Sequence, residues 1–330
     1  MRLCSIGMPC KGLPAWRGEQ SPTGPFTACP VVDLVFSSSR GIRSWCSRWY
    51  DLSVVRTAII SDIHANLEAL EVVLADIREQ GVDRIICLGD VIGYGPDPCA
   101  CIDLVQEHCQ FSLLGNHDFA CLLEPTNFNP IAAQGSYWTR AQFEPAGHDH
   151  DPAVTARRQS FLHLMKTYAF LDDDRDYLLV HASPKKPLSE YLFRDDVQKP
   201  SKLATAFLSM PGAHAFVGHT HVPGVFSGEL DGTGRISTES LFDFEYGNEL
   251  SGPFPLDRQD GQMKFIVNPG SVGQPRDGDR RASYAVLDAS GQTPTVEFLR
   301  LSYPAEVTAE KIRAIEQLAD RLGDRLLVGE

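Results

Sequence analysis

Short apolar segments alternate with helical segments in the early body of the chain. Residues 57–60, 84–88 and 111–114 are apolar runs of strand length. Residues 67–77 place leucine and isoleucine on one helical face, and residues 98–108 have the composition of a second helix. Strands that alternate with helices in this way pair in parallel through right-handed crossovers. The order therefore predicts an α/β fold.

The rest of the chain predicts further elements of the same domain. We expect helices over residues 130–142 and 153–170, and a surface hairpin or loop over the Gly-, Asp-, Glu- and Pro-rich residues 228–262. Short strands are expected at residues 177–180, 215–217, 222–226, 264–267, 283–287 and 295–301. The body, residues 56–303, is predicted to be one α/β domain with two sheets between helices. Residues 304–330 are predicted to form a helical tail packed on it, with the helix over 305–328.

The first 55 residues differ in composition from the rest. Residues 1–55 carry a net charge of +3 and five prolines, whereas the remainder carries −16. They show no sustained helical or strand period, which favours disorder. Our hypothesis is a mis-annotated extension, with a natural start near Val54 or Val55, because a bacterial GTG start codon read internally is translated as Val.

Composition excludes several classes of protein. The net charge is −13 with no basic stripe, so we expect no binding along a nucleic-acid tract. No apolar run approaches the roughly 20 residues of a membrane span, so no membrane partner is expected. The nine cysteines all lie in the first 121 residues, and an odd number so placed is a poor disulfide framework. Reduced cysteines predict a cytoplasmic protein.

Five segments carry side chains that can bind metal, and most follow a predicted strand. They are Asp62-Ile63-His64, Asp90, Asn116-His117-Asp118, His181 and His219-Thr220-His221. In open α/β sheets, sites form beyond the carboxyl ends of the strands, so these segments are expected to converge. Carboxylate, amide and imidazole ligands suit Mn, Fe, Zn or Ni. The set together predicts a metal site.

The spacing within two of these segments suggests paired ligands. Residues at i and i+2 of an extended chain point the same way. We therefore expect Asp62 with His64, and His219 with His221, each to present two ligands to one centre.

In order along the chain, these segments resemble the motif series of the calcineurin-like metallophosphoesterase superfamily. The matching stretches are Ser61–His64, Gly89-Asp90, Gly115–Asp118, His181 and Gly218–His221, within about residues 56–303. Residues 268–276, Asn-Pro-Gly-Ser-Val-Gly-Gln-Pro-Arg, look like the late loop of its small prokaryotic phosphodiesterase branch. The resemblance implies a four-layer αββα sandwich, with two mixed sheets flanked by helices and a dinuclear metal centre at the sheet ends.

The resemblance also implies a role for each residue. One divalent cation would take Asp62, His64 and His221, the other would take Asn116, His181 and His219, and Asp90 would bridge them. Manganese is the first choice, with iron, zinc or nickel as alternatives. A hydroxide between the cations would attack a phosphoryl group, His117 would act as general acid, and Asp118 would orient a neighbouring residue.

The predicted function is that of a phosphoesterase acting on a small phosphate monoester or diester. A dinucleoside-polyphosphate or other nucleotide hydrolase is the alternative enzyme, and a non-catalytic scaffold on the same fold is the alternative class. The turn after Asp90, Val91–Gly95, lacks the arginine of the eukaryotic Ser/Thr phosphatases, which disfavours that branch. We expect each of three arginines to make either a phosphate contact or a surface salt bridge. They are Arg276, Arg280 and Arg281. Pocket walls are expected from the irregular residues 124–150 and 228–262, and the oligomeric state stays open.

Overall fold

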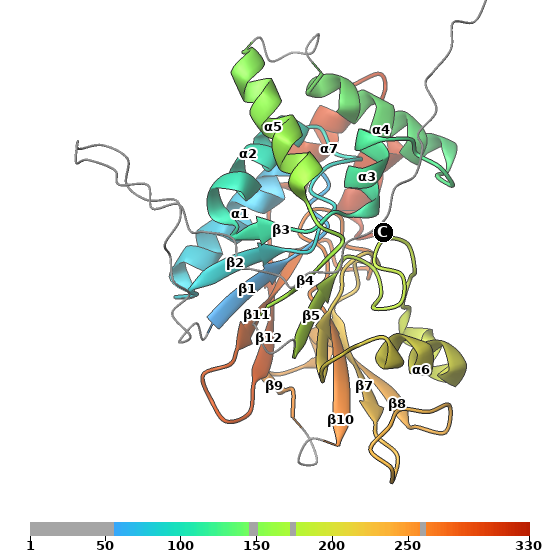
Figure 1. Ribbon diagram of the computed structural model, residues 1–330. Coiled ribbons are helices and arrows are strands. Elements are labelled where there is room, and N and C mark those ends of the chain that lie inside the picture. The colour runs from blue at the N-terminus through green and yellow to red at the C-terminus, as the bar shows by residue number, and fades with distance from the viewer. Residues whose placement is uncertain (1–55, 145–150, 172–175, 258–261) are drawn as a thin grey trace, which may run out of the picture. The chain divides into compact units, whose positions relative to one another are not determined.

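The computed structural model describes residues 56–144, 151–171, 176–257 and 262–330. The predictions for residues 1–55 therefore lie outside the described residues. Two six-stranded sheets and the helices around them make up the described fold (Figure 1).

The first sheet collects strands from both ends of the body. Its order is β3 (Phe111–Ser112), β2 (Arg84–Cys87), β1 (Arg56–Ile60), β11 (Ala282–Asp288), β12 (Thr295–Leu301) and β9 (Phe254–Pro255). The strands β1, β2 and β3 pair in parallel, as the crossover argument predicts. Strand β11 pairs antiparallel with β1, β12 with β11, and β9 with β12.

The second sheet collects strands from the middle of the chain. Its order is β4 (Tyr168–Phe170), β5 (Tyr177–Val180), β6 (His214–Phe216), β10 (Met263–Asn268), β7 (Gly224–Glu229) and β8 (Phe242–Tyr246). The strands β5, β6 and β10 are parallel and the other pairings are antiparallel, so both sheets are mixed.

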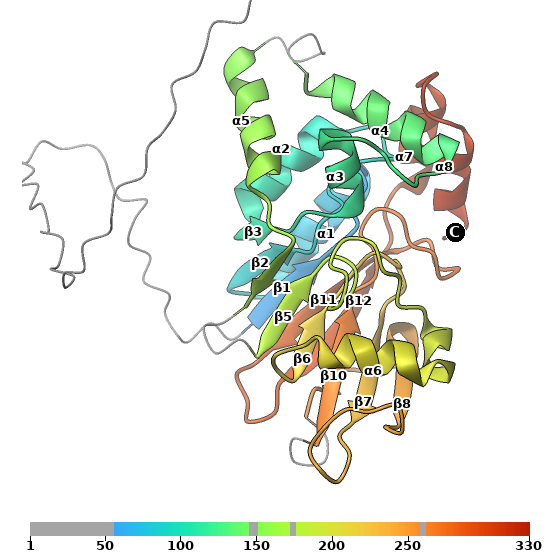
Figure 2. The same ribbon diagram turned by 45° about the vertical axis from the view of Figure 1, so that its right-hand side comes forward.

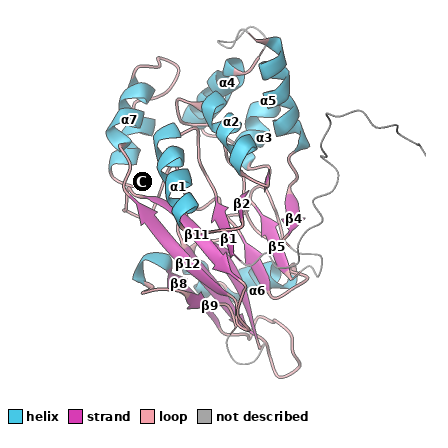
Figure 3. Cartoon of the chain, turned by 90° about the vertical axis from the view of Figure 1, so that its left-hand side faces the viewer, coloured by secondary structure: helices cyan, strands magenta, loops and turns pink. Residues whose placement is uncertain are grey.

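Side chains that alternate along β1 separate the layers. Ala58 and Ile60 join a buried cluster with the helices α1 (Leu67–Glu79) and α2 (Pro98–His108). Ile59 points the other way, into a cluster shared with Leu179 and Phe265 of the second sheet. Figure 3 shows α1 beside α7 (Ala305–Arg313) over the strands of the first sheet.

Helix α6 (Pro200–Leu208) closes the other side. Its Leu203 and Phe207 pack with Phe226 and Ile266 on the outer face of the second sheet (Figure 2). The order helix, sheet, sheet, helix confirms the predicted αββα sandwich. The remaining helices are α3 (Asn116–Leu122), α4 (Pro130–Gln142), α5 (Pro152–Leu164), α8 (Arg321–Asp324), η1 (Arg194–Gln198), η2 (Gly247–Glu249) and η3 (Arg325–Leu327).

Two predicted helices differ in the structure. The helix expected over 153–170 ends at Leu164, because residues 168–170 form β4 and take backbone hydrogen bonds from β5. The helix expected over 305–328 breaks after Arg313, and α8 folds back on α7. There Gly323 approaches so closely that a Cβ would lie 2.9 Å from the Ala309 carbonyl oxygen. The expected loop over 228–262 contains β8 and β9.

Candidate metal centre

The predicted ligands follow the ends of strands in both sheets. Asp62 and Asp90 lie just beyond β1 and β2, and Asn116 is the first residue of α3 after β3. His181 follows β5 directly, and His219 lies three residues beyond β6. All five follow strands that have a parallel neighbour, so the loops open at one edge of the sandwich.

Asp62, His64 and His221 form one group of buried ligand atoms. His221 Nε2 lies 3.2 Å from Asp62 Oδ1, and His64 Nε2 lies 3.9 Å from the same oxygen. The two Nε2 atoms are 3.2 Å apart. Three ligand atoms thus surround one small space.

Asp90, His181 and His219 form a second group. Asp90 Oδ2 lies 3.3 Å from His181 Nε2, which in turn lies 3.1 Å from Asn116 Oδ1. The same Asp90 oxygen lies 3.7 Å from His64 Nε2 of the first group. Asp90 therefore stands between the two groups, where a bridging ligand would be.

The donor set fits two divalent cations. Asp62 Oδ1, Asp90 Oδ2 and His219 Nε2 are buried and make no hydrogen bond to a described residue, although buried polar atoms are normally paired. His181 Nδ1 donates to the Leu88 carbonyl and His221 Nδ1 donates to the Gln274 carbonyl. Each of these bonds fixes the tautomer that leaves Nε2 free to accept a metal ion.

Ionisation within the centre follows its burial and its charges. Burial alone would raise the pKa of Asp90, but the charges of His181 and His117 lower it overall. Burial would lower the pKa of His181, but Asp90 beside it raises that pKa to about 9. Burial lowers the pKa of His219 to about 3. A cation at this place would take over the role of the His181 proton, because metal ligands bind in their deprotonated form.

The backbone of the ligand segments is left-handed rather than extended. Asp62, His64, Asp90, His219 and His221 have φ between 49° and 67°. The expectation that i and i+2 residues of an extended chain point together is therefore wrong. Asp62 and His64 do share a group, but His219 and His221 belong to different ones. Non-glycine residues in this conformation are strained, and such strain gathers at functional sites.

His117 and Asp118 lie on the first turn of α3. The backbone N–H of His117 donates to Asp90 Oδ1 at 2.8 Å. The His117 ring packs on the Tyr94 ring, with 4.2 Å between centroids. Burial lowers the pKa of His117 to about 4. A nitrogen of His117 also lies within 4.8 Å of ligand atoms of His64 and Asp90, so distance alone leaves its role open.

Asp118 supports the loop that carries Asp90. Its Oδ2 accepts the N–H groups of Asp90 at 2.8 Å and Gly115 at 3.0 Å, and its Oδ1 accepts that of Ile92 at 3.1 Å. Burial and the neighbouring charge of Asp90 raise the pKa of Asp118 to about 7. Asp118 thus orients Asp90 through the backbone.

The 268–276 loop braces the centre in a way that sequence reasoning did not foresee. Ser271 Oγ donates to the Asp62 carbonyl at 2.8 Å, and the Asn268 amide donates to the Gly218 carbonyl at 2.7 Å. Gly273 lies so close that a Cβ there would sit 1.7 Å from the Ile63 carbonyl oxygen. The available signal was the run of short polar residues and glycines that directly follows a strand.

The arginine that ends this loop, Arg276, and the two that follow it differ in their contacts. Arg280 pairs with Glu306 at 2.7 Å and Arg281 with Asp279 at 2.6 Å, so both form surface ion pairs. Arg276 is half-buried, and its charge acts on His64, His117 and His221. Arg276 is therefore the arginine that faces the centre.

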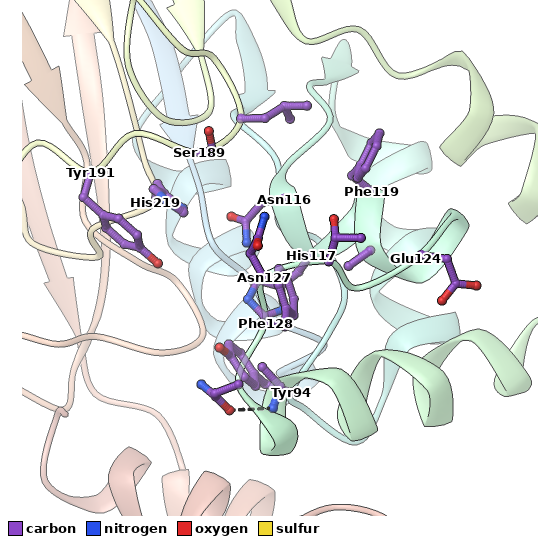
Figure 4. Close-up of a pocket in the computed structure, with 15 residues that line it drawn as sticks. Tyr94, Asn116, His117, Phe119, Glu124, Asn127, Phe128, Ser189, Tyr191 and His219 are labelled. Carbon is purple, nitrogen blue, oxygen red and sulfur yellow. Dashed lines mark hydrogen bonds between the residues drawn. The ribbon is translucent and has the colours of Figure 1, made fainter.

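A cavity of about 340 Å³ opens beside the second ligand group (Figure 4). Glu124, residues 126–129 and Ala132 line it, in agreement with the predicted wall at 124–150, of which residues 145–150 lie outside the described part. The predicted wall at 228–262 is wrong. The described part of that segment forms β8 and β9 at the sheet edges, and Leu188, Ser189 and Tyr191 line the cavity instead.

The fold and the site together define a class of αββα proteins with ligand-type side chains at the strand ends. The chain belongs to the calcineurin-like phosphoesterase superfamily, whose domain profile matches residues 55–292. The predicted family is thus confirmed, while the narrower phosphodiesterase branch stays a prediction.

Two relatives share about a third of their residues with this chain. The uncharacterised protein MJ0912 of Methanocaldococcus jannaschii is 34% identical over 280 residues, which cover 82% of this chain and 97% of that protein. A metallophosphoesterase from Sphaerobacter thermophilus of known structure is 35% identical, with a TM-score of 0.64 over 84% of this chain and 99% of that one.

A hypothetical protein from Pyrococcus horikoshii shares the fold at lower identity. It is 16% identical, with a TM-score of 0.61 over 84% of this chain and 99% of that one. Within the described residues, none of the helices combines the length and the apolar character that a membrane crossing requires.

Proposed function

We propose that this protein is a metal-dependent phosphoesterase that hydrolyses a small phosphate monoester or diester. One observation carries the proposal. Asp90 Oδ2 is buried and makes no hydrogen bond to a described residue, and it lies 3.3 Å from a nitrogen of one ligand group and 3.7 Å from a nitrogen of the other. Membership of the superfamily and the metallophosphoesterase from Sphaerobacter thermophilus support it.

Seven side chains would hold two divalent cations, of which manganese is our first choice. They are Asp62, His64, Asp90, Asn116, His181, His219 and His221. When bound, the cations would polarise the phosphoryl group and activate the attacking water. The chain's own residues fix the ligand geometry, since Asp118 holds the Asp90 loop and the 268–276 loop holds Asp62.

Two further residues would act on the substrate itself. His117 would donate a proton to the leaving oxygen, because the negative charge of a bound phosphoryl group raises the pKa of an adjacent imidazole. Arg276 would contact a phosphoryl oxygen, since it is the arginine of its segment that faces the centre rather than a surface carboxylate.

The test is Mn²⁺-dependent hydrolysis of bis-p-nitrophenyl phosphate and p-nitrophenyl phosphate, which also separates diester from monoester preference. Asp90→Ala is expected to lose bound metal and activity together. Asp195→Ala removes an aspartate that is 76% exposed and is expected to match the wild type. No turnover with any divalent metal would favour the scaffold instead.

The role of His117 has its own test. His117→Ala is expected to keep bound metal and to lose turnover by a factor of roughly 10²–10⁴. The loss should be smallest for p-nitrophenyl esters, whose leaving group needs little protonation, and largest for alkyl phosphates. Release of metal by this variant would instead identify His117 as a ligand.

We also propose a cytoplasmic location and a small-molecule partner. The described cysteines, Cys87, Cys99, Cys101, Cys109 and Cys121, are all free thiols, which suits a reducing compartment. The formal charge of −13 argues against a nucleic-acid tract as partner.

A further inference from the structure

The cavity beside the centre is large enough for more than a phosphate group. Its volume of about 340 Å³ lies within the roughly 300–1,000 Å³ of small-molecule sites. Asn116, His117 and His219 line its inner end, so a phosphoryl group at the centre would place the rest of its ester in this space.

Aromatic rings bound the cavity on several sides. Phe119 is 36% exposed and Tyr191 is 39% exposed, and Figure 4 shows them on opposite sides with His117 between them. Tyr191 stacks on His219 at 3.8 Å and on Phe193 at 5.2 Å between ring centroids, so its orientation is fixed. Phe119 is therefore the ring that offers its flat surface to a planar ligand, while Tyr191 bounds the opposite side of the cavity.

An amide side chain lines the same cavity as these rings. Asn127 has a left-handed backbone with φ of 65°, lies in the exposed 124–129 loop, and makes no hydrogen bond to another described residue through its side chain. Asn127 lines the same cavity as Asn116 and His117 (Figure 4). An amide both donates and accepts hydrogen bonds, which is the combination that reads the edge of a heterocyclic base.

The charge of the lining argues against a second phosphate. The described residues that line the cavity include no lysine and no arginine. Glu124, the acidic residue among them, already accepts the Tyr137 hydroxyl at 3.0 Å and pairs with Arg140 at 3.7 Å. The lining therefore suits an uncharged group and not a polyphosphate chain.

We infer that this cavity binds the leaving group of the substrate and that the leaving group is a nucleoside. The inference rests on the proposed phosphoesterase function and names its substrate class, a nucleoside monophosphate. The base would stack on Phe119, on the side of the cavity opposite Tyr191, with its edge toward Asn127. A water oxygen forms a bond to phosphorus, the phosphorus–ribose oxygen bond breaks, and the nucleoside leaves as an alcohol with a proton from His117.

Binding to the full chain after chelator treatment tests the cavity without its chemistry. Calorimetry with adenosine, guanosine, cytidine and uridine is compared with calorimetry with ribose. We expect at least one nucleoside to bind 10-fold or more tightly than ribose. Phe119→Ala is expected to weaken that binding by roughly 5-fold or more, because stacking on an aromatic side chain contributes that much per base. Equal binding of ribose and all four nucleosides overturns the inference.

A second cavity variant and a control variant outside the cavity complete the binding test. Asn127 lies in an exposed loop, and Asn127→Ala is expected to weaken binding of the same nucleoside. This variant covers the case in which Phe119→Ala fails to fold. Tyr168→Ala removes a ring that is 53% exposed and outside the cavity lining, and it is expected to bind nucleoside as the wild type does. Unchanged binding by both cavity variants overturns the inference.

Hydrolysis separates this inference from the proposed function. With Mn²⁺, kcat/KM for the nucleoside 5′-monophosphate is expected to exceed that for ribose 5-phosphate by 10-fold or more, and Phe119→Ala is expected to reduce this ratio. Equal kcat/KM for the two esters overturns the nucleoside inference and leaves the phosphoesterase intact. No hydrolysis of either ester, or of p-nitrophenyl esters, overturns the phosphoesterase itself.

Discussion

One oxygen of Asp90 is held by the protein and the other is left for a ligand. Oδ1 accepts a hydrogen bond from the backbone N–H of His117 at 2.8 Å, while Oδ2 faces His64 of the first ligand group and His181 of the second. The Asp90 backbone is fixed in turn by the Asp118 carboxylate. The geometry of the proposed centre therefore depends on a residue that would touch neither metal nor substrate.

Asp118→Asn tests this support. An amide NH₂ cannot accept the N–H groups that the carboxylate accepts from Asp90, Gly115 and Ile92. We expect metal affinity and kcat each to fall by roughly 10- to 100-fold, as is typical when a group that orients a ligand is lost. Metal titration and steady-state kinetics measure both.

The matched control for this change is Asp195→Asn, at an aspartate that is 76% exposed. An Asp118→Asn variant with unchanged affinity and kcat would contradict the prediction. It would indicate that Asp118 already carries a proton, which a pKa of about 7 allows near neutral pH.

Gly218 sets the space around Asp62. A Cβ at this position would lie 2.1 Å from Ser61 Oγ and 2.6 Å from Asp62 Oδ2. Gly218→Ala is therefore expected to displace the Asp62 carboxylate, weaken metal binding, and lower the free energy of unfolding by about 1–3 kcal/mol. Denaturant unfolding and metal titration check it. Gly232→Ala, where nothing lies within 4 Å, should leave both unchanged, and equal behaviour of the two variants would refute the argument.

Sequence alone predicted the ligand-type residues but not the contacts that position them. Asp62, Asp90 and His219 stand out because each follows a predicted strand, and a glycine directly precedes Asp90 and His219. The bracing bond from Ser271 to Asp62 joins residues 209 positions apart, and a contact of that range has no local pattern. Left-handed φ values at non-glycine residues have no sequence signal either.

At the scale of elements, the C-terminal helices support the cavity wall. Leu318, Leu322 and Ile312 pack in one buried cluster with Tyr94 and Ala132, and the last two line the cavity. The helical break after Arg313 allows this packing, because α8 returns its apolar side chains to the same cluster as α7.

Leu322→Ala tests this packing. Leu322 is 3% exposed, so the truncation leaves a cavity and is expected to lower the free energy of unfolding by about 2–5 kcal/mol. Urea unfolding followed by circular dichroism measures the change. Val307→Ala truncates a residue of α7 that is 44% exposed and should cost far less. Similar losses for the two variants would show that α8 contributes no core.

Elements with strong local patterns were predicted well, and those that depend on partners were not. Helices α2 and α4 begin and end where expected, since Pro98 and Pro130 stand at their first positions. The strand β4 is only three residues long and forms because β5 lies beside it. Helix α6 was missed because nine residues give too few turns for a clear period.

At the scale of the whole molecule, the centre lies where the two sheets meet, so its ionisation is linked to global stability. Burial is the main cause that lowers the pKa of His64, His117, His219 and His221 below the ordinary value of 6.5. In the unfolded chain these imidazoles take up protons below pH 6.5, while in the fold they stay neutral. Their contribution to stability is thus present above pH 6.5 and is lost as the pH falls.

His181 acts in the opposite direction. Its pKa is raised to about 9, so its contribution is complete below pH 6.5 and is lost as the pH rises toward 9. The four histidines lower stability in acid, and His181 lowers it in base. Asp118, whose pKa is raised from 3.8 to about 7, offsets about one of the four histidines between those values. The chelator-treated protein should therefore be most stable near neutral pH, and its stability should fall more steeply on the acid side. Each of the four contributes up to about 1.4 kcal/mol per pH unit below 6.5.

Denaturant unfolding of the chelator-treated protein from pH 5 to 9 measures this profile. His219→Gln removes one buried imidazole with a pKa of about 3, and the acid side of its profile should be less steep. His163→Gln removes an exposed imidazole of α5 and should retain the wild-type slope. A free energy of unfolding that stays constant from pH 7 to pH 5 would mean that these histidines are not kept neutral by the fold. If they were, the unfolded state would take up more protons than the fold below pH 6.5, and the free energy of unfolding would have to fall.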